Sequence, residues 1–159
     1  MKTLERILFN ACASLTILVL VIITYDAYNR IYADNLLLRS AYEPTFKDAE
    51  KMLLRAVRAV PDTHYKDKAG VVYYEIFRMS GDTRAYDNAS KLLYASAMQN
   101  PYNPEPLIHL IQLDIVAVKI DMLKQPTKRG LWACDAAENL DKNNATIKNL
   151  VKELRGKKK

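Results

Sequence analysis

The chain has 159 residues, of which 50% are hydrophobic and 26% charged, with four glycines, six prolines, two cysteines and a net charge of +6. This length suits one small domain and excludes two large ones. Few glycines and no sustained alternation of apolar and polar residues exclude a β-sandwich or barrel. Two cysteines cannot form a disulfide framework.

The first predicted element is an apolar segment over residues 7–25, nineteen residues without a charge. At about 1.5 Å per residue, a helix of this length comes close to the ~30 Å of a membrane's hydrocarbon core. A cleaved secretory signal peptide is the alternative, because Lys2 and Arg6 precede the segment. However, the apolar run is longer than a typical signal-peptide core, and the nearest small-residue cleavage pattern, residues 31–33, lies well past its end. We therefore expect an uncleaved signal anchor.

The basic residues around this segment indicate its orientation. Only Lys and Arg count in the positive-inside rule, and the cluster closest to the membrane lies on the N-terminal side. We therefore expect residues 1–25 to form a cytoplasmic stub and a transmembrane helix. Residues 26–159 then lie outside the cytoplasm, in the periplasm if the chain belongs to a bacterial inner membrane. Small and polar residues that favour contacts between membrane helices lie in the first half of the segment: Asn10, Ala11, Ala13 and Ser14.

A helical stalk is predicted over residues 26–44, because neither Gly nor Pro occurs before Pro44. Tyr25 and Tyr28 suit the aromatic belt at the headgroup level. Three further residues lie too far along the stalk for that belt, and we expect them to pack on the soluble domain or on a partner: Tyr32, Leu36 and Tyr42.

Prolines, glycines and capping residues divide the remaining sequence into helices of ordinary length. The first of these helices is predicted to begin at Thr45 and to end before Pro61, and the second to begin at Asp62 or Thr63 and to run to about Ser80, where Gly81 closes it. The others are predicted from Asp82 or Thr83 to Asn100, from Pro104 to Leu123, from Pro126 to about Leu140, and from Asn143 or Asn144 to Arg155. The predicted fold class is all-α, with one transmembrane helix followed by about five to six helices. Residues 45–141 are predicted to form the helical domain, and residues 142–159 a basic C-terminal helix and tail.

Two of these predicted helices repeat each other. In each, a small residue is followed by a large apolar residue four positions on, a small residue three further on and a proline five beyond that. The pattern occurs as Ala49, Leu53, Ala56 and Pro61, and again as Ala89, Leu93, Ser96 and Pro101. Small residues allow neighbouring helices to approach closely, and the leucines fill the space between them.

This spacing resembles that of the tetratricopeptide-like (TPR-like) superfamily of helical hairpins, over roughly residues 45–123. The repeat period here is forty residues where that family has about 34. The Trp and Leu-Gly signature of the family's first helix is absent, and Gly70 with Tyr74 is the best substitute. The resemblance implies a short solenoid of stacked hairpins that recognises a helix or extended peptide of another protein along a concave face.

The predicted helix over residues 104–123 is apolar on all sides, as is typical of a central buried helix. A second membrane span is the alternative, but five of its residues would be costly in lipid. These residues are His109, Gln112, Asp114, Lys119 and Asp121. We expect a soluble core helix that carries a thin polar strip of His109, Gln112 and Lys119, and we expect Asp114 to be a solvated or capping charge.

Signals for catalysis and for metal or cofactor binding are nearly absent from the sequence. His64 and His109 have no second ligand three or four residues away, and no phosphate loop, CxxC or HExxH motif occurs. Cys12 and Cys134 suit small buried apolar positions. We therefore expect a protein that is not an enzyme and that needs no cofactor or metal. Because residues 7–141 are close to neutral, we also expect no nucleic-acid partner.

The ten tyrosines and the polar strip suggest where a partner binds. Tyr73 and Tyr74 diverge by about 100° on a helix, so one ring is expected to face a groove. Tyr and Arg side chains in grooves are typical interface anchors. The candidate partner-binding residues are Tyr73, Tyr74, Arg78, His109, Gln112 and Lys119.

The net positive charge is concentrated at the C-terminus, where seven basic residues stand against Glu153 alone in residues 142–159. This tail is either a solvated terminal helix or a contact for anionic lipid or an acidic partner. As a whole, the sequence predicts a membrane-anchored protein–protein interaction module: an adaptor, an assembly factor or an accessory subunit of a membrane complex. The alternative is a structural subunit held mainly through its transmembrane helix.

Overall fold

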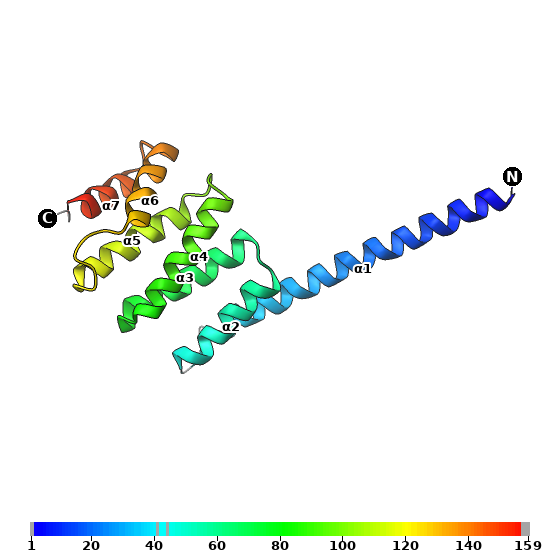
Figure 1. Cartoon of the computed structure of the whole chain (residues 1–159), viewed down its shortest axis with the longest axis horizontal. Helices are drawn as coiled ribbons and strands as arrows, with labels where there is room; N and C mark the ends of the chain where they lie inside the picture. Colours follow the sequence, from blue (N-terminus) through cyan, green and yellow to red (C-terminus); the bar gives the residue numbers. More distant parts are fainter. Residues whose placement is uncertain (1, 41, 44, 157–159) are drawn as a thin grey trace.

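The computed structural model describes residues 2–40, 42–43 and 45–156, with side chains from residue 11 onward apart from that of residue 46. These residues form seven α-helices and no strand, which confirms the all-α prediction. The helices are α1 (Lys2–Ser40), α2 (Phe46–Ala59), α3 (Thr63–Ser80), α4 (Thr83–Gln99), α5 (Glu105–Lys119), α6 (Lys128–Leu140) and α7 (Ala145–Arg155). Figure 1 shows α1 extending far beyond the group formed by α2–α7, with α7 at the opposite end of the molecule.

The helix boundaries follow local capping chemistry. Five helices begin with an N-cap residue whose side-chain oxygen accepts a hydrogen bond from a backbone N–H of the first turn. These N-cap residues are Thr45, Asp62, Asp82, Thr127 and Asn144. Gly81 closes α3 in the left-handed conformation, with φ of 67°. The predicted end of α5 at Leu123 is wrong, because α5 ends at Lys119 and the chain turns through Asp121, whose φ is 58°.

The long helix α1 is continuous from the apolar segment into the predicted stalk. Its 39 residues correspond to about 58 Å at 1.5 Å per residue. Within the described residues, α1 is the one helix long and apolar enough to span a membrane. In the stalk, Ala33, Leu36 and Leu37 are buried, and this part of α1 packs on α2 and α3.

The packing predicted for the three stalk residues is confirmed for one of them only. Leu36 is 8% exposed, whereas Tyr32 and Tyr42 are 40% and 86% exposed. Tyr32 lies on a different side of α1 from the stripe of Ala33, Leu36 and Leu37. Tyr42 lies in the turn after α1, which ends at Ser40. The predicted end of the stalk at Pro44 lies outside the described residues.

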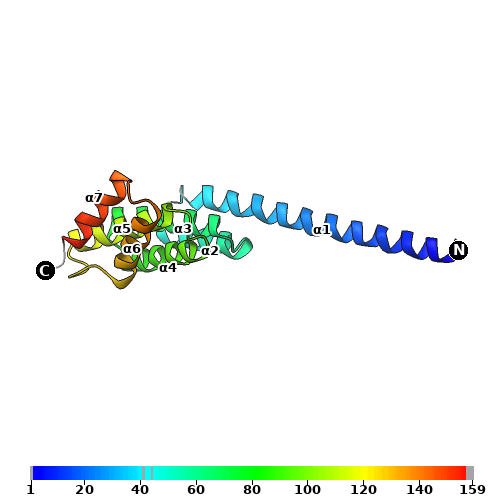
Figure 2. The same cartoon turned by 90° about the horizontal axis from the view of Figure 1, so that it is seen from above.

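The helices pack in two layers. Each helix contacts the next, and alternate helices also touch: α1 with α3, α3 with α5 and α5 with α7. Figure 2 shows α1, α3, α5 and α7 on one side and α2, α4 and α6 on the other. The small and apolar residues of the sequence repeat lie in this core and are all buried: Ala49, Leu53, Ala56, Ala89, Leu93 and Ser96. Gly70 allows α3 and α4 to approach closely, because a Cβ there would collide with the Leu93 side chain.

The central position predicted for the apolar helix is confirmed, because α5 contacts α3, α4, α6 and α7. Asp114 on α5 was predicted to be a solvated or capping charge, and it is not solvated, since it is 2% exposed. Its carboxylate accepts hydrogen bonds of 2.7 Å from the Tyr86 hydroxyl and from the backbone N–H and hydroxyl of Thr127. Asp114 therefore supports the N-cap of α6, and Gly130 leaves room for it, because a Cβ there would collide with the carboxylate.

Candidate functional site

A groove of about 650 Å³ lies in the odd-numbered layer, where α3 forms the floor between the stalk part of α1 and the start of α5. Its lining combines aliphatic side chains with charged ones at the edges. The lining residues are Asp34, Leu37, Leu38, Tyr42, Asp67, Lys68, Val71, Val72, Glu105 and His109. A mostly apolar hollow with a few polar groups is the usual form of a binding site.

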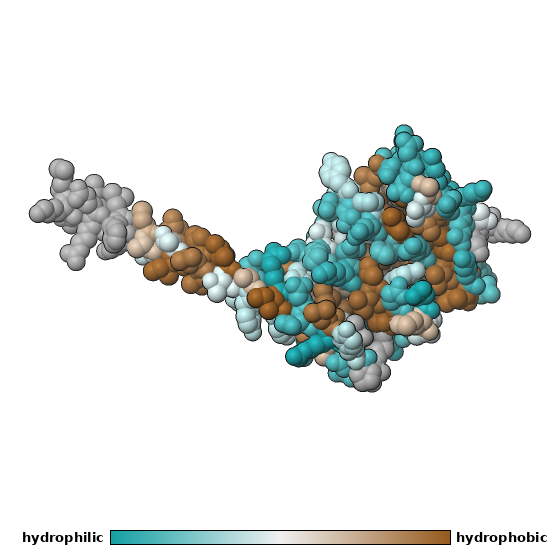
Figure 3. Space-filling model, turned by 180° about the vertical axis from the view of Figure 1, so that it is seen from behind, coloured by the Kyte–Doolittle hydropathy of each residue, from teal (hydrophilic) through white to brown (hydrophobic). Residues whose placement is uncertain are grey.

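A second hollow, of about 400 Å³, continues along α3 towards the start of α2. It shares Val71 and Val72 with the first hollow, so the two form one surface, which we call the α3 groove. The second hollow is lined by Ser40, Glu43, Thr45, Ala49, Val71, Val72, Glu75, Ile76, Met79 and Ser80. The hydropathy surface of Figure 3 shows apolar patches between hydrophilic ones on the helical domain, besides the apolar surface of α1.

Acidic residues dominate the charge of the α3 groove. Five carboxylates line the two hollows: Asp34, Glu43, Asp67, Glu75 and Glu105. Lys68 and His109 are the basic residues of the lining, and the Lys68 ammonium lies 3.8 Å from Asp34. Arg78, one turn beyond Glu75, forms an ion pair with it, with 2.7 Å between the guanidinium nitrogen and the carboxylate oxygen. The groove therefore combines an apolar floor with a net negative border.

Asp67 on α3 and His109 on α5 both line the groove, and their side chains interact electrostatically. Burial raises the pKa of the Asp67 carboxyl, His109 and His64 oppose that rise, and Glu105 adds to it. The Oδ1 atom of Asp67 and the Nδ1 atom of His109 are buried without a hydrogen-bond partner in the part of the chain that the structure describes. An unpaired buried polar atom carries a desolvation cost that a hydrogen bond from another group would offset.

Tyr73 does not belong to an exposed binding surface, contrary to our prediction. It is fully buried, and Tyr74 is only 8% exposed. Both rings are covered because α3 is enclosed by helices on several sides, with α1, α2, α4 and α5 all in contact with it. The expectation that one ring of the pair faces a groove assumed a helix that packs on one side only.

Four of the predicted partner-binding residues lie near one another on α3 and α5, namely Tyr74, Arg78, His109 and Lys119. The Tyr74 ring is 5.9 Å from the His109 ring. Burial raises the pKa of Tyr74, as does Glu75, while Arg78 and Lys119 act against that rise. Lys119 also forms a 2.7 Å ion pair with Glu153 of α7. Gln112 is half-buried one turn beyond His109, but of these residues only His109 lines the α3 groove.

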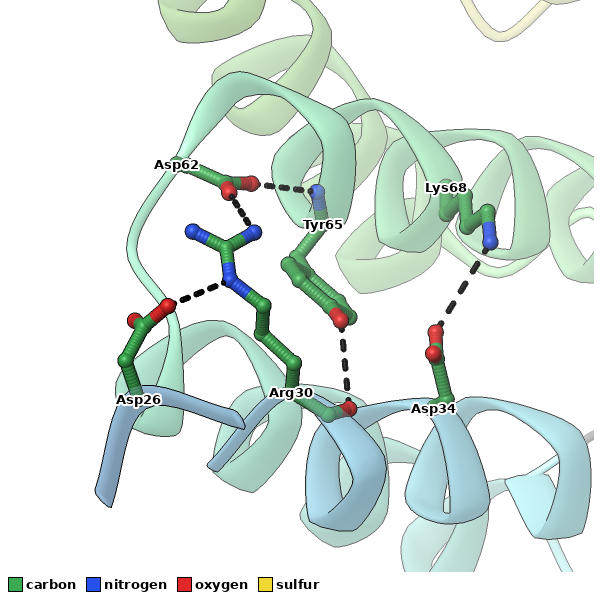
Figure 4. A network of polar contacts seen from close by, with 6 residues as sticks. All are labelled: Asp26, Arg30, Asp34, Asp62, Tyr65 and Lys68. Carbon is green, nitrogen blue, oxygen red and sulfur yellow. Dashed lines mark hydrogen bonds and ion pairs between the residues drawn. The ribbon is translucent and has the colours of Figure 1, made fainter. Parts of the chain in front are cut away.

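A polar junction fixes the stalk of α1 to the start of α3 (Figure 4). Arg30 contacts Asp26 at 2.8 Å and Asp62 at 3.0 Å. The Tyr65 hydroxyl donates a 3.1 Å hydrogen bond to the backbone carbonyl of Arg30. Since Asp62 also caps α3, its carboxylate joins the stalk of α1 to α3, the floor of the groove.

The predicted membrane-helix contacts lie on the part of α1 that extends away from α2–α7 (Figure 1). Ala11 and Ser14 are exposed and Ala13 is half-buried, and the side chain of Asn10 lies outside the described residues. Cys134 is fully buried, and burial raises the pKa of its thiol to about 11, whereas Cys12 is exposed. In the basic tail, α7 packs through Ile147, Val151 and Leu154, and residues 157–159 lie outside the described part.

Sequence reasoning missed most of the α3 groove, because its walls come from helices far apart in the chain. The detectable signal was the pair Val71 and Val72, two apolar residues beside the buried tyrosines that the core does not fully cover. No family model, curated protein or solved structure matches this chain. Among the described residues, no group of three His, Cys, Asp or Glu side chains is placed to hold a metal ion.

Proposed function

We propose that the protein is a membrane-anchored protein–protein interaction module that binds a segment of a partner protein in the α3 groove. It would act as an adaptor, an assembly factor or an accessory subunit of a membrane complex, without enzymatic activity. One observation carries this proposal: the helix suited to a membrane is also a wall of the groove, since Asp34, Leu37 and Leu38 of α1 line it. The anchor would thereby hold the groove close to the membrane surface.

The packing of the stalk supports the proposal that α1 is retained as a signal anchor. Ala33, the last residue of the nearest cleavage pattern, is fully buried, and removal of α1 up to that residue would remove part of the domain core. We propose a single-pass protein of the bacterial inner membrane with residues 26–159 in the periplasm. The basic residues before the span support this orientation.

The mode of recognition follows from the groove's shape and charge. Alternate helices in contact form one layer, as expected for a TPR-like stack of hairpins, and such stacks bind helices or extended peptides along the layer. Apolar side chains of the partner would lie on Val71 and Val72, and basic side chains would meet the acidic border. The chemistry therefore favours an apolar segment that carries Lys or Arg.

Site-specific photo-cross-linking in native membranes tests this function. A photoreactive residue at Val72 in the groove is expected to give one discrete cross-linked partner. The same residue at Met98, which is 56% exposed on α4, serves as the control outside the groove and is expected to give none. Glu105→Lys is expected to weaken the Val72 cross-link, whereas Asp87→Lys on α4 leaves it unchanged. Equal cross-linking from Val72 and Met98 contradicts the proposal.

A structural subunit held through its membrane helix is the second candidate function. The exposure of Ala11 and Ser14 on α1 supports it, because small and polar residues mediate contacts between membrane helices. Replacement of residues 7–25 by leucine separates the two functions. Loss of partner assembly favours the structural subunit, whereas retention of the Val72 cross-link favours the groove-binding adaptor.

A further inference from the structure

The face of α1 opposite the helical domain carries a second apolar stripe. Residues 28, 31, 35 and 38 follow one another at steps of three, four and three. Their side chains, Tyr28, Ile31, Asn35 and Leu38, are all exposed. We call this stripe the seam. Ile31 and Leu38 are each 64% exposed, although they lie about 9 and 20 Å beyond Tyr25 along the helix and thus outside the hydrocarbon.

The seam continues into the membrane half of α1 with the same spacing. Residues 14, 17, 21 and 24 extend it by two heptads. A hollow of about 500 Å³ already follows this face, lined by Ile17, Leu20, Val21, Thr24, Tyr25 and Tyr28. These residues occupy seam positions and the positions directly beside them. In a coiled coil, such residues form the holes into which core side chains of the neighbouring helix insert.

We infer that α1 forms a parallel, two-stranded coiled coil with α1 of a second copy of this chain. The seam supplies the contact, with Asn35 at a core position, where a single Asn fixes register and favours two strands. Two copies of a single-pass protein enter the membrane in the same direction and to the same depth, so their seams are parallel and in register.

Charge complementarity identifies the second copy as the occupant. Asp34 and Arg39 flank the seam on opposite sides and are five residues apart, which is the spacing of an interhelical ion pair in a parallel coiled coil. Twofold symmetry forms this pair twice. Both side chains are accessible, since Arg39 is exposed and the Asp34 side chain is 52% exposed beside Lys68.

The domains do not obstruct this contact. The residues of α1 that pack on α2 and α3, including Ala33, Leu36 and Leu37, lie about half a turn away from the seam. Leu38 belongs to the seam and also lines the α3 groove, so the second copy's α1 lies along the edge of each groove. The dimer itself does not depend on the groove having a partner.

Cysteine cross-linking of the full-length chain in membranes tests the inference. The background is Cys12→Ser, and Cys134 remains because it is fully buried. Under mild oxidation, Asn35→Cys and Leu38→Cys are expected to form disulfide-linked dimers at least about fivefold more than Tyr102→Cys. Tyr102 is 85% exposed in the turn before α5 and reports random collisions. Equal cross-linking at all three positions overturns the inference.

A charge-reversal series tests the identity of the occupant without altering the core of the seam. In the Asn35→Cys background, Arg39→Asp is expected to lower cross-linking roughly fivefold, because it sets like charges against each other twice. Addition of Asp34→Arg in the same chain is expected to restore it. Failure of the double variant to recover overturns pairing with a second copy. Glu105→Lys in the groove is expected to leave cross-linking unchanged, which separates this test from that of the proposed function.

Discussion

The two halves of α1 share one secondary structure but have opposite surroundings. Residues 15–23 are apolar on all sides, and their large side chains are 46–62% exposed. In the stalk half, a buried apolar stripe alternates with polar residues, and those polar residues hold the edges of the contact with the domain. The comparison shows that apolar content alone does not decide where a helix packs. A helix that is apolar all round suits lipid, whereas a stripe suits another helix.

The largest expected effect comes from removal of each half in turn. A chain that starts at residue 26 is expected to fold cooperatively in water, because the deleted half of α1 extends away from α2–α7 (Figure 1). A chain that starts at residue 42 loses the burial of Leu36 and Leu37. That burial contributes about 3–6 kcal/mol to the free energy of unfolding. Thermal unfolding followed by circular dichroism distinguishes the two chains, and equal stability would contradict the role of the stalk in the core.

A matched pair of leucine substitutions sharpens the same comparison. In the full-length chain, Leu36→Ala is expected to lower the domain's free energy of unfolding by about 2–4 kcal/mol, because it leaves a cavity against α2 and α3. Leu18→Ala removes the same atoms from a side chain that is 55% exposed and is expected to leave the domain's stability unchanged. Denaturant titration in detergent micelles measures both. A loss of similar size from the two substitutions would show that the halves are not independent.

The difference between the halves also explains which parts of the fold the sequence predicts. Local signals place the elements: Thr45, Asp62 and Asp82 begin helices as expected, and the Ala–Leu–Ala spacing of the repeat identifies buried faces. These signals depend on residues within a few turns of one another. The burial of Leu36 follows from its distance from the predicted membrane span, and the central position of α5 follows from its being apolar on all sides.

The predictions that are wrong concern residues at places where three helices meet. One ring of the Tyr73 and Tyr74 pair was expected to face a groove, but both are buried. Asp114 was expected to be a solvated or capping charge, and it is buried and enclosed by Tyr86 and Thr127. Neither environment is encoded by neighbouring residues, because the contacts come from helices 13 or more positions away. The α3 groove is of the same kind: Asp34, Asp67 and Glu105 meet only once α1, α3 and α5 are packed. A single sequence supplies the faces of helices but not the helix that each face meets.

A pH-dependent effect is expected at the groove floor, next to the packed half of α1. Burial raises the pKa of Asp67 in the folded chain, so its stabilising contribution is complete below the unfolded value of about 4 and is lost as pH rises through the folded value. Asp67→Asn is therefore expected to raise the free energy of unfolding at pH 7. The gain is expected to shrink as pH falls towards 4.

Urea titrations of the chain starting at residue 26, at several pH values, measure this effect. Asp87→Asn is the control, because Asp87 is an exposed carboxylate on α4. This substitution is expected to leave the free energy of unfolding unchanged at every pH. A gain from Asp67→Asn that stays constant with pH would mean that the substitution acts through packing and not through the charge.

The smallest expected effect lies at the boundary between the two halves, where Arg30 bridges Asp26 and Asp62. All three side chains are at least one-third exposed, so solvent and salt screen the two ion pairs. Arg30→Gln is expected to lower the melting temperature of the chain starting at residue 26 by less than Leu36→Ala does, and the loss is expected to fade as salt is raised. Arg39→Gln removes the same charge from the same helix without breaking a contact to the domain, and it is expected to have no effect. If Arg30→Gln instead destabilises the chain equally at low and high salt, the junction acts through the buried Tyr65 beside it. The boundary of the stalk is then fixed by packing, as the rest of its inner face is.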